Sequence, residues 1–138
     1  MGKATEHFLT EELVSKQVYR VIGDDAVKLL DPRLLTVLEE IRSLLGVPLI
    51  CNNWHTGGSR DDCGYRDLLC TIGAKRSAHK DGMAVDLISS RMKAADMRKI
   101  IIANADKISY PIRIEEGVTW LHVDVRNTSN QHIQIFHS

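Results

Sequence analysis

The chain has 138 residues, of which 43% are hydrophobic and 26% are charged, and this balance excludes a disordered chain. Eighteen basic and eighteen acidic side chains cancel, so the chain lacks the net field that draws proteins to nucleic acids or anionic membranes. Its apolar runs are far shorter than the roughly 20 residues that span a bilayer. We therefore expect one domain over residues 1–138, with a buried core, no nucleic-acid partner and no membrane insertion.

The N-terminus and the cysteines bear on the cellular compartment. The first residues, "MGKATEHFLTEELVSKQ", contain no apolar segment of the signal-peptide kind. Cys51, Cys63 and Cys70 form no C-x-x-C pair, and three cysteines cannot all be joined to one another in disulfides. We interpret them as reduced thiols and expect a cytoplasmic protein; the alternative is that Cys63 and Cys70 are metal ligands.

Two helices are predicted in the first third of the chain. The first begins after Thr10, which can cap it, and ends at Gly23. The second begins at Pro32 behind a capping Asp31, and its apolar side chains recur at helical spacing until Gly46 ends it. Neither helix carries a group with evident chemistry, so we expect both to form the scaffold.

The remaining sequence predicts strands around a third helix. A buried apolar run and four alternating or apolar segments later in the chain indicate strands. A polar, glycine-rich stretch indicates a long loop, which in a small domain often carries function. In chain order these are a strand at 47–53, the loop at 54–74, a strand at 83–89, the helix at 92–108, and strands at 110–114, 118–126 and 132–136, with a tight hairpin turn at 115–117. This order predicts an α+β fold, with N-terminal helices packed on a small, mostly antiparallel sheet.

Three polar side chains stand out within or beside these strands: His79, Asp86 and His122. Asp86 lies inside an apolar strand, where a carboxylate is costly unless it is paired or bound to a cation. Alternation places Trp120, His122 and Asp124 on one face of their strand, opposite its apolar face. If the two strands are neighbours, then His79, Asp86 and His122 converge. Two imidazoles and a carboxylate are three of the four ligands of a tetrahedral zinc, with one position left for water.

These residues also carry a family resemblance. The segment "SAHKDGMAVD", followed by "WLHVD", resembles the pattern S-x-H-x-x-G-x-A-x-D … H-x-D and matches it at every defined position. That pattern marks the zinc D-alanyl-D-alanine carboxypeptidases and related peptidoglycan endopeptidases, which share a fold with the hedgehog signalling domain. The segments "NNWHTGG", "GYR" and "RIEEGVTWLHVDVR" are similar to small peptidase-like proteins of phages and bacteria, so the resemblance covers residues 29–136. It implies that His79, Asp86 and His122 bind Zn²⁺.

The resemblance also implies roles around the metal. In the family, an arginine from the loop before the first motif holds the substrate carboxylate, and the planar fork of arginine suits that task. Arg66 is the first choice for this role and Arg60 the second. Ser77 and Trp120 are expected to contact the substrate at the site, and Asp124 to orient a ligand histidine through a hydrogen bond.

The catalytic base departs from the family pattern. Many members place a glutamate three residues before the second zinc histidine, and here that position is Thr119, which cannot act as a base. Glu115 and Glu116 lie seven and six residues before His122. If Glu116 and Gly117 form the hairpin turn, Glu115 faces the same side as His122, so we favour Glu115 and keep Glu116 as the alternative.

The function that follows is hydrolysis of D-alanyl-type or L,D peptide bonds of peptidoglycan by a zinc carboxypeptidase or endopeptidase. A phage endolysin that stays in the cytoplasm until lysis releases it to the cell wall fits the missing signal peptide. Thr119 keeps a second hypothesis open, a zinc-binding module without hydrolytic activity, such as a phage structural or interaction protein. A third is a structural zinc site closed by His55 or Cys63.

Overall fold

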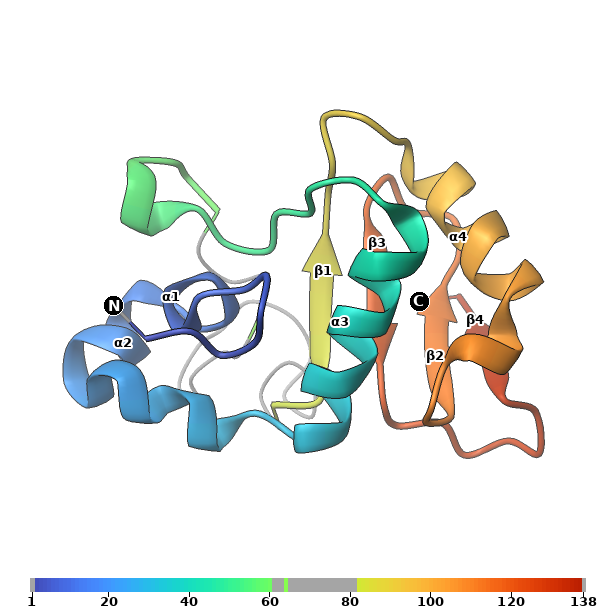
Figure 1. Ribbon diagram of the computed structural model, residues 1–138, viewed down its shortest axis with the longest axis horizontal. Helices are drawn as coiled ribbons and strands as arrows, with labels where there is room; N and C mark the ends of the chain where they lie inside the picture. The colour runs from blue at the N-terminus through green and yellow to red at the C-terminus, as the bar shows by residue number, and fades with distance from the viewer. Residues whose placement is uncertain (1, 61–63, 65–81, 138) are drawn as a thin grey trace.

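The computed structural model describes residues 2–60, 64 and 82–137. Its described α-helices lie in the first third of the chain and between the first two strands, and its described strands lie in the second half (Figure 1). The elements are α1 (Thr10–Leu13), α2 (Lys16–Ile22), η1 (Gly23–Leu29), α3 (Pro32–Leu45), η2 (Trp54–Thr56), β1 (Ala84–Leu87), α4 (Ala94–Ala103), η3 (Ala105–Lys107), β2 (Ile112–Glu115), β3 (Leu121–Asp124) and β4 (Ile133–Phe136). The predicted α+β class is confirmed.

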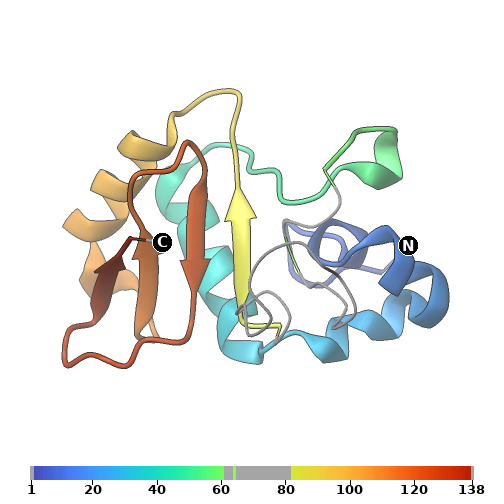
Figure 2. The same cartoon turned by 180° about the vertical axis from the view of Figure 1, so that it is seen from behind.

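The four strands form one mixed sheet in the order β1-β3-β2-β4. Strand β3 is antiparallel to both of its neighbours, and β4 runs parallel to β2. Helices α3 and α4 cover one face of the sheet, and the other face is turned towards the viewer in Figure 2. Helices α1 and α2 lie beyond the β1 edge, at the opposite end of the molecule from β4.

The two faces of the sheet differ in chemistry because side chains alternate along each strand. The face under the helices is apolar, and its fully buried side chains belong to the main core cluster: Val85, Leu87, Ile112, Ile114, Leu121 and Val123. The opposite face carries the ionisable side chains: Asp86, Arg113, Glu115, His122 and Asp124. A rigid sheet with a packed back therefore presents these groups together on its front.

Helix α3 forms as the sequence predicts. The Asp31 side chain accepts a hydrogen bond from the backbone N–H of Arg33 at 2.9 Å, and Pro32 occupies the first turn. Gly46 ends the helix in the left-handed conformation with φ 67°. Leu38 and Ile41 are fully buried against the sheet, so this helix anchors the core.

The predicted helix between Thr10 and Gly23 is in fact two helices. Val14 is extended between them, and the Ser15 hydroxyl caps α2 by accepting from the Val18 N–H at 3.3 Å. The carbonyl of Val14 accepts from the Asn52 side chain at 2.9 Å and from the Trp54 indole at 3.1 Å. The break thus lets a backbone carbonyl bind a distant segment, which helical periodicity does not reveal.

The prediction of a strand at 47–53 is wrong. Only Ile50 pairs with the sheet, through a single antiparallel bridge to Ile88. Two residues later the chain has turned towards the N-terminal helices, because the N–H of Asn52 donates to the carbonyl of Glu12 at 2.9 Å. The apolar run reflects burial beside the sheet and not membership of it.

The hairpin between β2 and β3 is present, but its connection is longer than predicted. Residues 116–120 link the strands, so Trp120 precedes β3 and does not share a strand face with His122. Arg98 of α4 holds this loop by donating from Nη1 to the carbonyls of Val118 and Trp120, each at 3.2 Å. In the described part of the chain, no helix has the length and apolar character needed to cross a membrane.

Candidate metal centre

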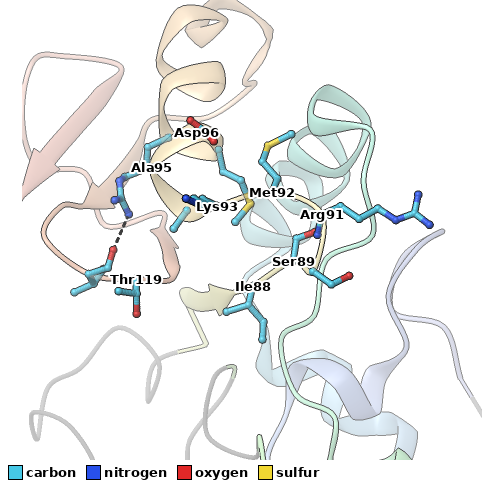
Figure 3. A pocket seen from close by; sticks show the side chains of 13 residues that line it. Ile88, Ser89, Arg91, Met92, Lys93, Ala95, Asp96 and Thr119 are labelled. Carbon is cyan, nitrogen blue, oxygen red and sulfur yellow. Dashed lines mark hydrogen bonds between the residues drawn. The ribbon is translucent and has the colours of Figure 1, made fainter.

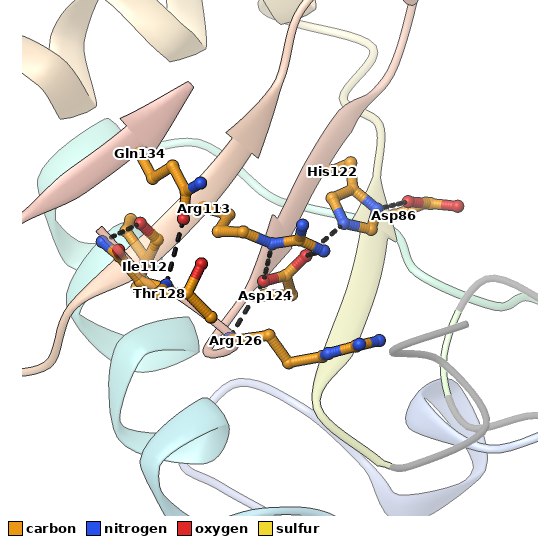
Figure 4. Close-up of polar contacts among 9 residues, drawn as sticks. Asp86, Ile112, Arg113, His122, Asp124, Arg126, Thr128 and Gln134 are labelled. Atoms are coloured by element: carbon orange, nitrogen blue, oxygen red, sulfur yellow. Dashed lines mark hydrogen bonds and ion pairs between the residues drawn. The ribbon is translucent and has the colours of Figure 1, made fainter. Parts of the chain in front are cut away.

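Asp86 and His122 are brought together by the pairing of β1 with β3. The antiparallel register sets the two residues directly opposite each other. Their side chains point to the front of the sheet, where the Nδ1 atom of His122 lies 2.8 Å from Oδ1 of Asp86 (Figure 4). Two of the three predicted metal ligands are therefore in contact. His79, the third, lies outside the described residues.

The second nitrogen of His122 is held by another carboxylate. Its Nε2 atom lies 2.8 Å from Oδ2 of Asp124, two residues further along β3. Asp124 is fully buried, and its Oδ1 also accepts from the backbone N–H of Arg126 at 3.0 Å. The predicted contact between Asp124 and a candidate ligand histidine is present, and both imidazole nitrogens have carboxylate partners.

Arg113 joins this cluster from β2, and sequence analysis gave it no role. Its Nε and Nη2 atoms donate to Oδ1 and Oδ2 of Asp124, each at 2.8 Å. The guanidinium also stacks over the ring of Phe136, 4.2 Å from its centroid, and the same ring meets His122 edge to face at 5.5 Å. One sequence signal was available, because Arg113 interrupts the apolar pair Ile112 and Ile114 as Asp86 interrupts β1.

The electrostatics of the cluster favour a charged imidazole. Burial lowers the pKa of His122, but its hydrogen bonds to Asp124 and Asp86 and their negative charges outweigh burial and raise that pKa to about 9. Burial raises the pKa of Asp124, but the hydrogen bonds from His122, Arg113 and the Arg126 backbone outweigh it and keep the pKa below its usual value. The cluster thus holds an imidazolium between carboxylates.

The two candidate bases differ in environment. Glu115 is the last residue of β2 and is 8% exposed. Continuing the β2–β3 register by one residue sets Glu115 opposite His122, on the same face as Arg113. Glu116 lies in the loop with an exposed carboxylate, 3.5 Å from the imidazole of His137. Glu115 therefore belongs to the front of the sheet as predicted, although the turn is not the predicted one.

The other predicted site residues divide into two groups. Arg60 is described, and its guanidinium binds backbone carbonyls, donating from Nε to Cys51 at 2.8 Å and from Nη2 to Asp86 at 3.3 Å. It therefore ties the loop to the strand of the candidate centre. Trp120 is 37% exposed in the loop before β3. The remaining predicted residues lie outside the described part of the chain: Arg66, Ser77, Cys63 and Cys70.

His55, the alternative fourth ligand, lies in η2. Its ring meets Trp54 edge to face, with 5.7 Å between the ring centroids. Cys51 is buried in the main core cluster.

A cavity of about 1060 Å³ opens between the end of β1, the start of α4 and the loop before β3 (Figure 3). Segment 88–93, the first turns of α4 and the loop before β3 line it. Ile88 lies two residues beyond Asp86, and Thr119 lies three residues before His122. Thr119, at the position where the resembled family has its glutamate, therefore lines this cavity, whereas Asp86 and His122 are not among its lining residues.

A different group of metal-binding side chains lies at the surface near the N-terminus. Single ligand atoms of Glu6, His7 and Glu39 all lie within 4.8 Å of one another. The Nδ1 atom of His7 is 2.7 Å from Oε1 of Glu39, and both side chains are partly exposed. Exposed acidic groups of this kind are common in proteins without a bound metal.

The candidate centre is therefore assembled from neighbouring strands, with His122 between Asp86 and Asp124 and with Arg113 behind Asp124. A fold of this class hosts many functions, so any assignment depends on these side chains. No family model, no curated protein and no solved structure matches the chain.

Proposed function

We propose that the chain is a zinc metallopeptidase that hydrolyses D-alanyl-type or L,D peptide bonds of peptidoglycan, as a phage lysin or a bacterial cell-wall enzyme. The observation that carries the proposal is the contact between Asp86 and His122. These residues come from the two separate halves of the sequence pattern, and their ligand atoms lie 2.8 Å apart on adjacent strands. A carboxylate and an imidazole held together on a rigid sheet suit a catalytic metal.

The donor chemistry of the site fits zinc. Zinc binds imidazole nitrogen and carboxylate oxygen, and histidine ligands usually donate their other N–H to a carboxylate. His122 has that arrangement, with Nδ1 towards Asp86 and Nε2 towards Asp124. The imidazolium must lose the Nδ1 proton when a metal binds, so binding releases a proton. His79, Asp86 and His122 would hold the ion.

The protein side chains then divide the work of amide hydrolysis. When bound, zinc lowers the pKa of a coordinated water and polarises the scissile carbonyl. Glu115 would take a proton from the attacking water and pass it to the leaving amine. Its position opposite His122 and its low exposure support this role over Glu116. Arg66 would hold the substrate carboxylate, with Arg60 as the alternative.

Thr119 favours a second function, a zinc-binding module that does not hydrolyse peptides. Its hydroxyl group has no pKa suited to a base, and it stands where many members of the resembled family have the glutamate. Thr119 also lines the cavity at the end of the sheet. In such a module, Asp86 and His122 would still bind the metal.

The test combines metal content with cleavage of cell-wall peptides. Purified protein is assayed for bound zinc and, by mass spectrometry, for amine released from muropeptides. Glu115→Gln and Glu116→Gln form a matched pair, because both remove one carboxylate from adjacent positions. We expect Glu115→Gln to lower kcat by about 100- to 10,000-fold with unchanged zinc content, and Glu116→Gln to retain activity.

The alternative outcomes are distinct. Zinc without any cleavage supports the binding module, and absence of zinc from the wild-type protein contradicts both hypotheses. A structural zinc site with four protein ligands is detected with the cobalt-substituted protein, since its spectrum should not respond to added anions. An open site should respond, because an anion can replace the bound water.

A further inference from the structure

We infer that Arg113 is a positioning residue of the candidate metal centre, which fixes the imidazole of His122 for the metal by holding Asp124. The inference rests on the proposed function, because it concerns the binding of a metal at Asp86 and His122. Arg113 does not touch either of these side chains through a hydrogen bond among the described contacts. It acts through Asp124, which contacts both Arg113 and His122.

The first step is the fork between Arg113 and Asp124. Nε and Nη2 reach the two carboxylate oxygens at 2.8 Å each, so the carboxylate can neither rotate nor shift without losing a hydrogen bond. Oδ2 of Asp124 is shared, because it also lies 2.8 Å from Nε2 of His122. The guanidinium therefore sets the position of the atom that orients the imidazole.

The second step concerns the ring of Phe136, which contacts both Arg113 and His122. Its face lies under the Arg113 guanidinium at 4.2 Å, and it meets the His122 ring edge to face at 5.5 Å. Strand β4 presents this ring beside β2, where Phe136 pairs with Glu115 in the parallel register. The guanidinium and the imidazole are thus packed against one rigid surface.

The third step is the environment of Asp124. Its side chain is fully buried, so its negative charge requires compensation by nearby donors. Loss of the Arg113 fork would remove two of these donors and leave the carboxylate held by the backbone N–H of Arg126 and by the imidazole of His122. Outer partners of metal-binding histidines commonly contribute about 10- to 100-fold to metal affinity.

The experiment measures zinc affinity by competition with a chelating dye, starting from metal-free protein. We expect Arg113→Met to weaken zinc binding by about 10- to 100-fold. Arg113→Lys keeps the charge but not the planar fork, so it should recover only part of that loss. Arg33→Met is the matched control, because Arg33 forms the same fork with Asp31 at 3.0 and 2.7 Å, away from the centre. It should leave zinc affinity unchanged.

A double variant tests whether Arg113 acts through Asp124. In an Asp124→Asn background the fork is already lost, so adding Arg113→Met should weaken zinc binding little further. A full additional loss would overturn the inference. If Arg113→Met does not fold, as judged by circular dichroism, Phe136→Leu provides the second measurement. It removes the surface under the fork, and it should weaken zinc binding in the same direction.

The results also separate this inference from the proposed function. If the wild-type protein binds zinc and Arg113→Met and Arg113→Lys bind it equally well, the inference is overturned and the metal site stands. If the wild-type protein binds no zinc, the proposed function itself is contradicted. Unfolding by urea without metal is measured for each variant, so that a loss of stability is not mistaken for a loss of affinity.

Discussion

His122 lies between two carboxylates, and in the metal-free protein this arrangement links its charge to stability. Its pKa is about 9 in the folded protein against an ordinary value of 6.5. Because the folded-state pKa is raised, the stabilisation is fully present below pH 6.5 and is lost as the pH rises towards 9. We expect the free energy of unfolding, measured with urea and a chelator, to fall by on the order of 3 kcal/mol across this window.

The control for this pH dependence is His122→Gln, which keeps a polar side chain but cannot titrate. Its free energy of unfolding should change much less between pH 6.5 and 9 than that of the wild-type protein. Parallel profiles for the two proteins would contradict the assignment of this titration to His122. The other described histidines serve as an internal comparison, since His122→Gln leaves them all in place.

Among single residues, sequence analysis identified two that break the pattern of their strand. Asp86 was found because a carboxylate in an apolar strand needs a partner, and His122 because alternation sets it opposite the apolar face. Arg113 breaks its strand in the same way but was missed, because its partner Asp124 lies across a hairpin whose register depends on tertiary structure. Phe136 was missed because a single aromatic residue in an apolar strand gives no signal.

Among the elements, the turn into β1 depends on Gly82. This residue has φ 71°, and a Cβ atom there would overlap the carbonyl oxygen of Leu29. Gly46, at the end of α3, has a similar φ of 67° but open space around it. Gly46→Ala should therefore lower the free energy of unfolding by about 1 kcal/mol through backbone strain alone.

Gly82→Ala adds steric overlap to the same backbone strain, so its cost should be larger, on the order of 3 kcal/mol. Both variants are compared by urea unfolding under the same conditions, with Gly46→Ala as the control for strain. Equal losses would show that the approach of Gly82 to Leu29 does not constrain the turn. The positive φ of Gly82 thus allows the chain to turn immediately before the strand that carries Asp86.

Helix α3 could be predicted because its signals are local: a cap, a proline, a periodic apolar face and a terminal glycine. The segment 47–53 could not, since its apolar side chains are buried beside the sheet while its backbone pairs mostly elsewhere. Asn52 illustrates this, because its backbone donates to Glu12 and its side chain to Val14. The length of the β2–β3 connection likewise depends on contacts with Arg98.

For the whole molecule, the class of fold could be predicted from the order of elements, but the arrangement of the sheet could not. Strand β3 lies between β1 and β2, so the centre joins strands separated by the whole of α4. Strand β4 runs parallel to β2, which no local pattern specifies. The contact between Asp86 and His122 is a consequence of this topology, and sequence reasoning could state it only as a condition.

The same topology predicts how a metal should affect the stability of the whole chain. An ion bound by Asp86 and His122 joins β1 to β3, so it binds the folded sheet and not the unfolded chain. At a free zinc concentration of about 100 times Kd, binding should stabilise the fold by about 2.7 kcal/mol and raise Tm by about 10 °C. Thermal unfolding with zinc and with a chelator measures this difference.

Two variants distinguish the candidate centre from the surface group near the N-terminus. Asp86→Asn removes a ligand from the sheet, whereas Glu39→Gln removes one from the group that includes Glu6 and His7. If zinc binds at the sheet, the rise in Tm should disappear in Asp86→Asn and persist in Glu39→Gln. The reverse result would place the stabilising ion at the surface, where it ties the N-terminal segment to α3, and would leave the pairing of Asp86 with His122 as an ion pair without a metal.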